Sequence, residues 1–138
     1  MNKTVTLIVP CYNEEESLPI FYRAVCDVAR GLPQYQISLL FVNDGSKDGT
    51  LSVMRNLAAQ DERVKYLSFS RNFGKEAAMY AGFCNAKGDY VAVMDADMQD
   101  PPSLLPEMLA ILETGEYDSV ATRRVTRDGE PPIRSFFA

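Results

Sequence analysis

Two aspartates, Asp95 and Asp97, follow directly after the apolar run 90–94. Two carboxylates at the end of a buried strand concentrate negative charge, and burying such charge without a counter-ion is costly. Carboxylate oxygens are the ligands that Mg²⁺ and Mn²⁺ prefer, and Mg²⁺ is commonly shared between protein carboxylates and the phosphates of a substrate. The pair therefore indicates a protein that binds a metal together with a diphosphate compound.

Gln99 continues the same two-residue spacing. If this segment is extended, alternate side chains point the same way, so that Asp95, Asp97 and Gln99 form one oxygen set for a cation, completed by a diphosphate and water. A structural alternative stays open, in which Asp100 belongs to a turn before two prolines and Ser103 caps a helix.

A further acidic residue, Asp44, follows the apolar run 37–42. Its carboxylate could accept a hydrogen bond from an N–H of a planar base, which is a directional contact that selects a nucleotide. An Asx turn is the structural alternative, because Asp-Gly is a strong turn signal. Asp48 is open to the same base-binding interpretation, or it only begins the next helix.

Two more segments carry suitable chemistry. In 10–14, Tyr12 offers a ring that could pack on a base and Glu14 a carboxylate for a ribose hydroxyl, although acidic residues here also suit the positive end of a helix. In 71–75, two cations flank a glycine at a helix start, which could hold a phosphate or sugar. This second segment lacks the Walker pattern, and a solvated basic loop is its alternative.

Composition excludes several classes of function. A net charge of −5, from 19 acidic and 14 basic residues, argues against a nucleic-acid surface. The absence of histidine excludes Ser-His-Asp and Cys-His nucleophile systems and histidine general bases. The three cysteines, Cys11, Cys26 and Cys84, show no CxxC spacing, so we expect them to be reduced and mostly buried.

Strand-like runs alternate with helical periodicity along the chain, which at 138 residues has the length of one domain. We expect strands over 5–9, 37–42, 64–69, 90–94 and 119–123, helices over 17–32, 50–60, 75–86 and 103–114, and a loop over 126–132. This alternation predicts an α/β fold with a parallel sheet wrapped by helices. Ligands bind beyond the carboxyl ends of such strands, where all the polar segments above lie.

Three motifs, VPCYNE (9–14), VNDGSKDGT (42–50) and MDADMQDPP (94–102), resemble those of glycosyltransferase family 2 in type and order. The last motif, together with RNFGK (71–75), is similar to that of the polyprenyl-phosphate sugar transferases, namely bactoprenol glucosyltransferases, dolichol-phosphate mannose synthases and aminoarabinose transferases. The resemblance covers essentially the whole chain. One departure is Asn43, which stands where relatives frequently have Asp.

The resemblance implies an inverting transferase with a GT-A (Rossmann-like) fold, a nucleotide-diphosphate sugar donor, and Mg²⁺ or Mn²⁺. The nucleoside pocket would match Pro10, Tyr12, Glu14 and Asp44, with further donor contacts from Asn72 and Lys75. Asp95, Asp97 and Gln99 would match the metal and diphosphate site. Arg124, Arg127 and Arg134 fall where relatives hold the acceptor phosphate, and Asp95, Asp97, Arg124 and Arg127 are the expected catalytic set.

Relatives of this kind continue for roughly another domain, often ending in membrane helices, and two aromatics close to the end of this sequence also suggest the front part of a longer protein. We expect residues 1–125 to form the nucleotide-sugar-binding GT-A domain and 126–138 the start of an acceptor-side loop. No apolar run here approaches the roughly 20 residues of a membrane span, so we expect this segment to be soluble and the full-length protein to sit at the cytoplasmic face of the inner or plasma membrane.

The expected reaction is direct displacement at the anomeric carbon by a polyprenyl phosphate, whose oxygen is already anionic and needs no strong base. UDP-sugar is the first expected donor and GDP-sugar the second, by family analogy; homo-oligomer formation is left open. Three alternatives remain: transfer to a carbohydrate hydroxyl, a nucleotidyltransferase, and a non-catalytic module that binds a nucleotide–metal complex or receives a phosphoryl group. The basic residues near the end of the chain could also bind a lipid headgroup or be solvated.

Overall fold

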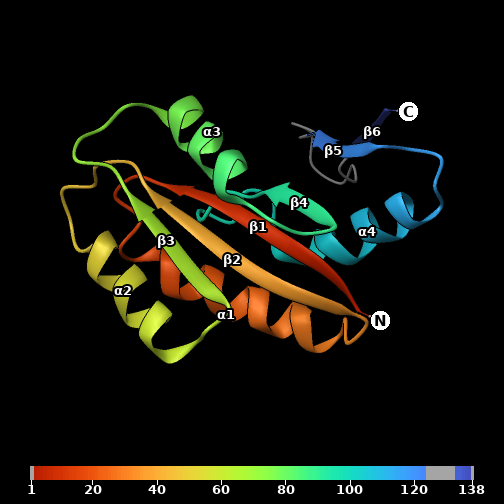
Figure 1. The fold of residues 1–138 in the computed structure, drawn as a ribbon, viewed down its shortest axis with the longest axis horizontal. Coiled ribbons are helices and arrows are strands. Elements are labelled where there is room, and N and C mark those ends of the chain that lie inside the picture. The colour runs from red at the N-terminus through yellow and green to blue at the C-terminus, as the bar shows by residue number, and fades with distance from the viewer. Residues whose placement is uncertain (1, 124–132, 138) are drawn as a thin grey trace. The chain divides into compact units, whose positions relative to one another are not determined.

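The computed structural model describes residues 2–123 and 133–137. The chain divides into two compact units, residues 1–102 and 103–138. In the first unit four strands alternate with three helices (Figure 1), in the order β1 (Lys3–Cys11), α1 (Ser17–Arg30), β2 (Tyr35–Asn43), α2 (Thr50–Gln60), β3 (Val64–Ser68), α3 (Lys75–Asn85) and β4 (Tyr90–Val93).

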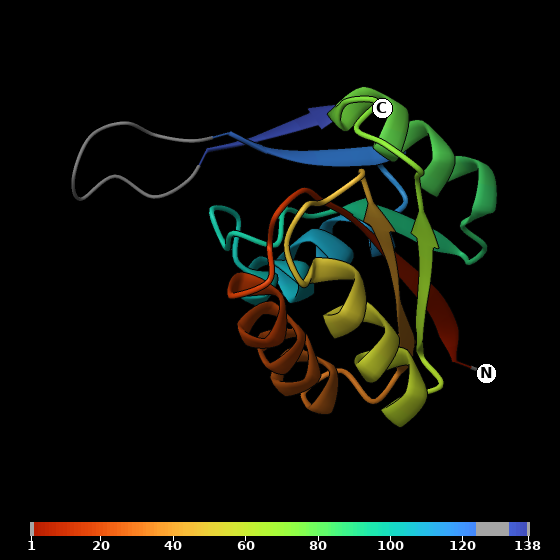
Figure 2. The same ribbon diagram turned by 90° about the vertical axis from the view of Figure 1, so that its left-hand side faces the viewer.

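The four strands form one parallel sheet in the order β3-β2-β1-β4. The chain moves outward from β1 to β3 and then crosses back to place β4 on the other side of β1. Because such crossovers are right-handed, this reversal puts α1 and α2 on one face of the sheet and α3 on the other (Figure 2). β1 is thus covered on both faces, and its residues 5–9 are all buried.

The core of this unit follows from the apolar pattern of its elements. Leu18, Phe21 and Val25 recur at helical spacing on α1 and are its buried residues. On α3, Ala78 packs in a buried cluster with Ile8 and Val42. Gly82 brings α3 closer still, since a Cβ at this position would lie 2.3 Å from Cγ2 of Ile8.

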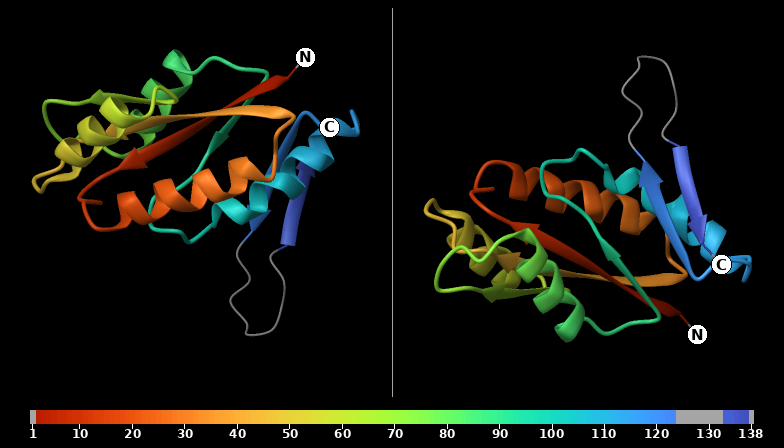
Figure 3. Two further views of the ribbon diagram at one scale, coloured as in Figure 1. Left: turned by 90° about the horizontal axis from the view of Figure 1, so that it is seen from below. Right: turned by 90° about the horizontal axis from the view of Figure 1, so that it is seen from above.

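The 3₁₀ turn η1 (Pro102–Leu104) begins at the last residue of the first unit. The second unit then contains α4 (Leu105–Glu113), β5 (Ser119–Arg123) and β6 (Ile133–Phe137). β5 and β6 pair as antiparallel strands, with Ser119 opposite Phe137 (Figure 3). The expected loop over 126–132 lies outside the described residues.

The structure confirms the expected α/β fold and each expected helix and strand, with ends that shift by a few residues. The helix expected from residue 103 begins at Leu105, after η1, and no side chain caps it. β6 was not expected. Within residues 2–123 and 133–137, no helix combines the length and the apolar character that crossing a bilayer demands.

Candidate functional site

A pocket of about 220 Å³ lies where β1, β2 and β4 end, wholly within the first unit. Its lining comes from the end of β1, from the loops after these strands and from the start of α3: Pro10, Cys11, Tyr12, Glu14, Asp44, Lys75, Asp95, Ala96, Asp97 and Gln99. Backbone hydrogen bonds extend the ladders to this edge, from Asp44 N to Cys11 O (2.9 Å) and from Met94 N to Ile8 O (2.9 Å). The site lies where β1 separates β2 from β4, at the reversal of strand order where open α/β sheets bind ligands.

The segment after β4 is a turn, so the expectation of an extended segment over 95–99 was wrong. Met98 N donates to Asp95 O (3.4 Å), and Met98 has φ +66°. The ladder ends because the next hydrogen bond toward β4 would need an N–H on Pro10, which proline lacks. Asp95, Asp97 and Gln99 still line one pocket, although not by strand alternation.

Asp95 is paired with Lys75, the only lysine among the described residues that line the pocket. Nζ of Lys75 lies 2.8 Å from Oδ1 of Asp95, and the two side chains are 59% and 26% exposed. Lys75 is the first residue of α3, so its charge is added to the partial positive charge at the N-terminus of that helix.

Asp44 is buried, and its carboxylate holds the loop that precedes α3. Oδ1 accepts from Phe73 N (2.8 Å), while Oδ2 accepts from Gly74 N (3.1 Å) and from Nδ2 of Asn72 (3.2 Å). The Nδ2 group of Asn72, an expected donor contact, also donates to Asp44 O (3.1 Å).

Glycine at position 45 permits this close approach of two loops. Gly45 has φ +68°, and a Cβ there would lie 2.2 Å from the carbonyl carbon of Arg71. The Asx-type bond of this turn comes from Asn43, whose Oδ1 accepts from Ser46 N (3.1 Å), so Asp44 is left for the 72–74 loop.

The loops after β1 and β2 are joined by reciprocal hydrogen bonds. Asn13 N donates to Oγ of Ser46 (2.9 Å), and Lys47 N donates to Oδ1 of Asn13 (2.8 Å). Glu14 N donates to Oγ1 of the buried Thr50 (2.8 Å). These bonds fix the chain at Asn13 and Glu14, directly after Tyr12. Tyr12 and Glu14 are two of the expected site residues that line the pocket.

Asp48 supports the same junction from the start of α2. Its carboxylate accepts from the backbone N–H of Thr50 (2.9 Å) and from that residue's hydroxyl. Burial raises the pKa of Asp48, but the hydrogen bonds from Thr50 and from Glu15 N outweigh it and lower the pKa overall. This geometry is that of the structural alternative for Asp48.

Sequence reasoning missed two groups. Cys11 lines the pocket although only its neighbours were singled out, and Asn13, Ser46 and Thr50 join the two loops. A signal for the second group was present, because Asn, Ser and Thr are short polar residues that commonly bond backbone groups in loops.

The three cysteines differ in environment. Burial, with smaller contributions from the charges of Glu14 and Asp95, raises the pKa of Cys11 far above its usual value, so this thiol stays protonated. Cys26 is partly buried and Cys84 is exposed, so the expectation of burial was wrong for Cys84. All three are free thiols in the described part of the chain.

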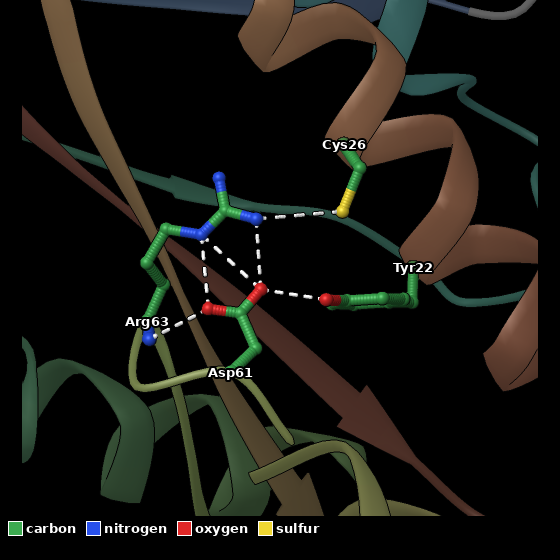
Figure 4. A network of polar contacts seen from close by, with 4 residues as sticks. All are labelled: Tyr22, Cys26, Asp61 and Arg63. Atoms are coloured by element: carbon green, nitrogen blue, oxygen red, sulfur yellow. Dashed lines mark hydrogen bonds and ion pairs between the residues drawn. The ribbon is translucent and has the colours of Figure 1, made fainter.

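Figure 4 shows a separate polar network of Tyr22, Cys26, Asp61 and Arg63. It lies at the amino end of β3, whereas the pocket lies at the carboxyl ends of β1, β2 and β4. Asp61, just after α2, accepts hydrogen bonds from the hydroxyl of Tyr22 (2.6 Å) and from Nη2 of Arg63 (2.7 Å). Arg63 also donates to Sγ of Cys26 (3.6 Å). The network ties α1 to the start of β3, which is a structural role remote from the pocket.

The pocket fits a divalent cation only as part of a larger ligand set. Among the described residues, no three His, Cys, Asp or Glu side chains form a group that could hold a metal. Asp95, Asp97 and Gln99 supply side-chain oxygens to the pocket lining, and Asp95 already binds the ammonium of Lys75. Mg²⁺ and Mn²⁺ accept such a partial set when phosphate oxygens and water complete it. Arg124 and Arg127 lie outside the described residues, as does the side chain of Arg134.

Solved structures confirm the expected GT-A type of fold. A mannosyltransferase from Pyrobaculum calidifontis in complex with GDP-Man and Mn²⁺ is similar with a TM-score of 0.71 and 23% identity, over 92% of this chain and 36% of that one. TarS (1–349) of S. aureus in complex with UDP is similar with a TM-score of 0.69 and 20% identity, over 95% of this chain and 38% of that one.

Sequence comparison gives closer relatives. The chain is 43% identical to a prophage bactoprenol glucosyl transferase homologue of Escherichia coli K12, over 94% of this chain and 42% of the relative. It is 42% identical to the putative glycosyltransferase CsbB of Bacillus subtilis 168, over 97% and 40%. The chain thus spans about two fifths of the length of these relatives. The sequence model of Glycosyl transferase family 2 matches residues 6–135, and the chain belongs to this family.

Proposed function

We propose that the full-length protein transfers a sugar from a nucleotide-diphosphate sugar to a polyprenyl phosphate, and that the pocket described above binds the donor. The observation that carries this proposal is the meeting of Tyr12, Glu14 and Asp44 with the pair Asp95 and Asp97 in one pocket. Family membership supports glycosyl transfer, and the relatives named bactoprenol glucosyl transferase support a polyprenyl phosphate acceptor.

The nucleoside half of the donor would be bound by residues of the β1 and β2 ends. The ring of Tyr12 is 42% exposed at the pocket and can stack on a base, while Glu14 can accept from a ribose hydroxyl. A carboxylate has about four lone-pair sites, and three N–H groups already bond to Asp44. Asp44 therefore has room for about one more donor, which is what a base N–H requires.

The diphosphate half would lie against the turn after β4 and the start of α3. Asp95 and Asp97, with Gln99 as a third oxygen, would hold Mg²⁺ or Mn²⁺, which supplies Lewis-acid stabilisation of charge on the leaving diphosphate. The solved mannosyltransferase with GDP-Man and Mn²⁺ supports a divalent cation in this fold. Lys75 and the N-terminus of α3 attract phosphate oxygens.

For the acceptor we propose that Arg124 and Arg127 hold the phosphate of the polyprenyl chain, and that its anionic oxygen attacks the anomeric carbon directly with inversion. A phosphate needs no histidine base, and the chain has no histidine. The donor-binding domain would extend over 1–125, past the end of the compact unit that carries the pocket, with 126–138 leading to the acceptor side. A polyprenyl acceptor places the full-length protein at the membrane, on the cytoplasmic face where nucleotide sugars occur.

The test is a transfer assay with the full-length protein, labelled UDP-glucose or GDP-mannose, Mn²⁺ and a polyprenyl phosphate in detergent. We expect a labelled polyprenyl-phosphate sugar and release of the nucleoside diphosphate. Asp97→Asn should lower the rate by about 100-fold or more, because charge on the leaving group loses its stabilisation. Asp100→Asn, in the same turn but outside the pocket lining, is the matched control and should leave the rate nearly unchanged.

Two results would contradict the proposal. If Asp97→Asn transferred the sugar at the wild-type rate, the proposed role of Asp95 and Asp97 in the reaction would be wrong. Transfer to a carbohydrate hydroxyl but not to the polyprenyl phosphate would assign a different acceptor class.

A further inference from the structure

Lys75 and Asp95 form an ion pair, although the proposed function assigns each of them a different part of the donor complex to bind. Asp95 would hold a cation, whereas Lys75 would contact the donor's diphosphate. In the structure these two side chains bind one another instead, at 2.8 Å. When a donor binds together with its cation, the ion pair must therefore open, so that Asp95 can contact the cation and Lys75 the diphosphate.

The backbone of Lys75 is held in place, whereas its side chain lies largely in solvent. Asp44 binds the two preceding N–H groups, those of Phe73 and Gly74, and Ala78 N donates to Gly74 O (3.1 Å) in the first turn of α3. The Lys75 side chain, by contrast, is 59% exposed. An ion pair this exposed is weak, so opening it costs little.

The charge balance of the pocket gives Lys75 its importance. Among the described residues that line the pocket, Lys75 is the one cation. Four carboxylates share this lining, those of Glu14, Asp44, Asp95 and Asp97. A diphosphate entering this field is repelled unless positive charge faces it. The ammonium also reduces the negative charge that a divalent cation would meet at Asp95.

We propose that Lys75 is an exchangeable counter-ion: it neutralises Asp95 before the donor binds and moves to the diphosphate oxygens when a divalent cation takes its place on Asp95. This inference rests on the proposed donor site. It makes Lys75 the residue that couples cation binding to nucleotide binding. Because such coupling is reciprocal, each ligand must raise the affinity for the other by the same factor.

The experiment measures Mn²⁺ affinity of the full-length protein from the electron paramagnetic resonance signal of free Mn²⁺, without nucleotide and with UDP or GDP in separate titrations. Nucleotide affinity at saturating Mn²⁺ is measured by calorimetry. We expect Lys75→Met to tighten Mn²⁺ binding without nucleotide by about fivefold or more and to weaken nucleotide binding by a similar factor. Lys47→Met, an exposed lysine of the β2–α2 loop that is outside the pocket lining, is the control and should change neither.

The outcomes separate this inference from the function on which it rests. If the wild type binds a nucleotide in a Mn²⁺-dependent way that Asp97→Asn abolishes, the donor site stands. If Lys75→Met then behaves like Lys47→Met, or tightens Mn²⁺ binding without weakening nucleotide binding, the counter-ion role of Lys75 is overturned while the donor site stands. If neither UDP nor GDP binds the wild type with Mn²⁺, both proposals fall.

Discussion

At the scale of single residues, Asp44 is the buried carboxylate on which the site's geometry depends most. Its oxygens accept from the N–H groups of Phe73 and Gly74, so it positions the start of α3 as well as lining the pocket. Asp44→Asn would turn an amide N–H toward these donors. We expect a loss of about 1–3 kcal/mol in the free energy of unfolding, measured by urea denaturation, because a buried group is left unsatisfied.

Asn72→Ala is the comparison for that variant. It removes only one side-chain donor to Asp44 and leaves both backbone donors in place. A smaller loss is expected, and equal losses in the two variants would show that the backbone contacts of Asp44 contribute nothing.

Asp61 carries a prediction about pH. Hydrogen bonds from the side chain of Arg63 lower the pKa of Asp61 far below its usual range; burial opposes this, and the hydroxyl of Tyr22 lowers it further. A carboxyl whose pKa is lower in the folded state stabilises the fold above the unfolded-state pKa of about 3.9, and this contribution is lost as the pH falls. Asp61→Asn should therefore be less stable than the wild type by about 1–3 kcal/mol at pH 7.

The difference should shrink steadily as the pH is lowered from about 5 toward 2, in denaturation curves measured at each pH. Asp27→Asn is the control, because the Asp27–Arg30 pair is exposed on α1 and should contribute little at any pH. A stability difference for Asp61→Asn that is independent of pH would contradict the assignment of the lowered pKa.

At the scale of elements, the contact of α3 with β1 depends on Gly82. A Cβ there would lie 2.3 Å from Cγ2 of Ile8, a branched and fully buried side chain that has little room to yield. We expect Gly82→Ala to destabilise the fold by about 1–3 kcal/mol through overpacking. Gly31→Ala is the control, because a Cβ there would lie 3.5 Å from Val28 O and the backbone angle φ of −84° suits alanine. Its free energy of unfolding should change by no more than about 0.5 kcal/mol.

A double variant tests the stated cause. If Ile8 is the obstacle, Gly82→Ala combined with Ile8→Ala should cost less than the sum of the two single changes, since the new methyl group fills space that Ile8 vacates. Strict additivity in chemical denaturation would place the strain elsewhere.

Much of the fold could be predicted from local patterns. The period of apolar residues predicted each helix and strand of the first unit, and the parallel sheet followed from their alternation. Seven pocket residues were expected for a related reason: polar residues after parallel strands meet at one edge. An eighth, Pro10, was expected from the resemblance to glycosyltransferase family 2. Asp44 was predicted to face a base, but its bonds to the loop before α3 depend on a different segment of the chain.

The remaining differences share a non-local cause. The turn over 95–99 replaces an extended segment because Pro10, on the neighbouring strand, cannot continue the ladder. β6 depends on pairing with β5 across the intervening segment, and its sequence shows little alternation. The placement of a small side chain such as Cys11 at a pocket wall leaves no pattern in the sequence.

At the scale of the whole molecule, the pocket is smaller than its proposed ligand. Its volume of about 220 Å³ falls below the roughly 300–1,000 Å³ of usual ligand sites, so a nucleotide sugar would reach beyond these residues. The chain also spans only about two fifths of its relatives' length. Tests of donor binding and of transfer therefore belong in the full-length protein.

The most direct test of the donor site is thermal unfolding of the full-length protein with UDP or GDP, each with and without Mn²⁺. A ligand at 100 times its dissociation constant adds about 2.7 kcal/mol, which raises the unfolding temperature by several degrees. We expect such a rise with one nucleotide, dependent on Mn²⁺ and absent in Asp97→Asn. No rise with either nucleotide, or an equal rise in Asp97→Asn, would contradict a donor site built on Asp95 and Asp97.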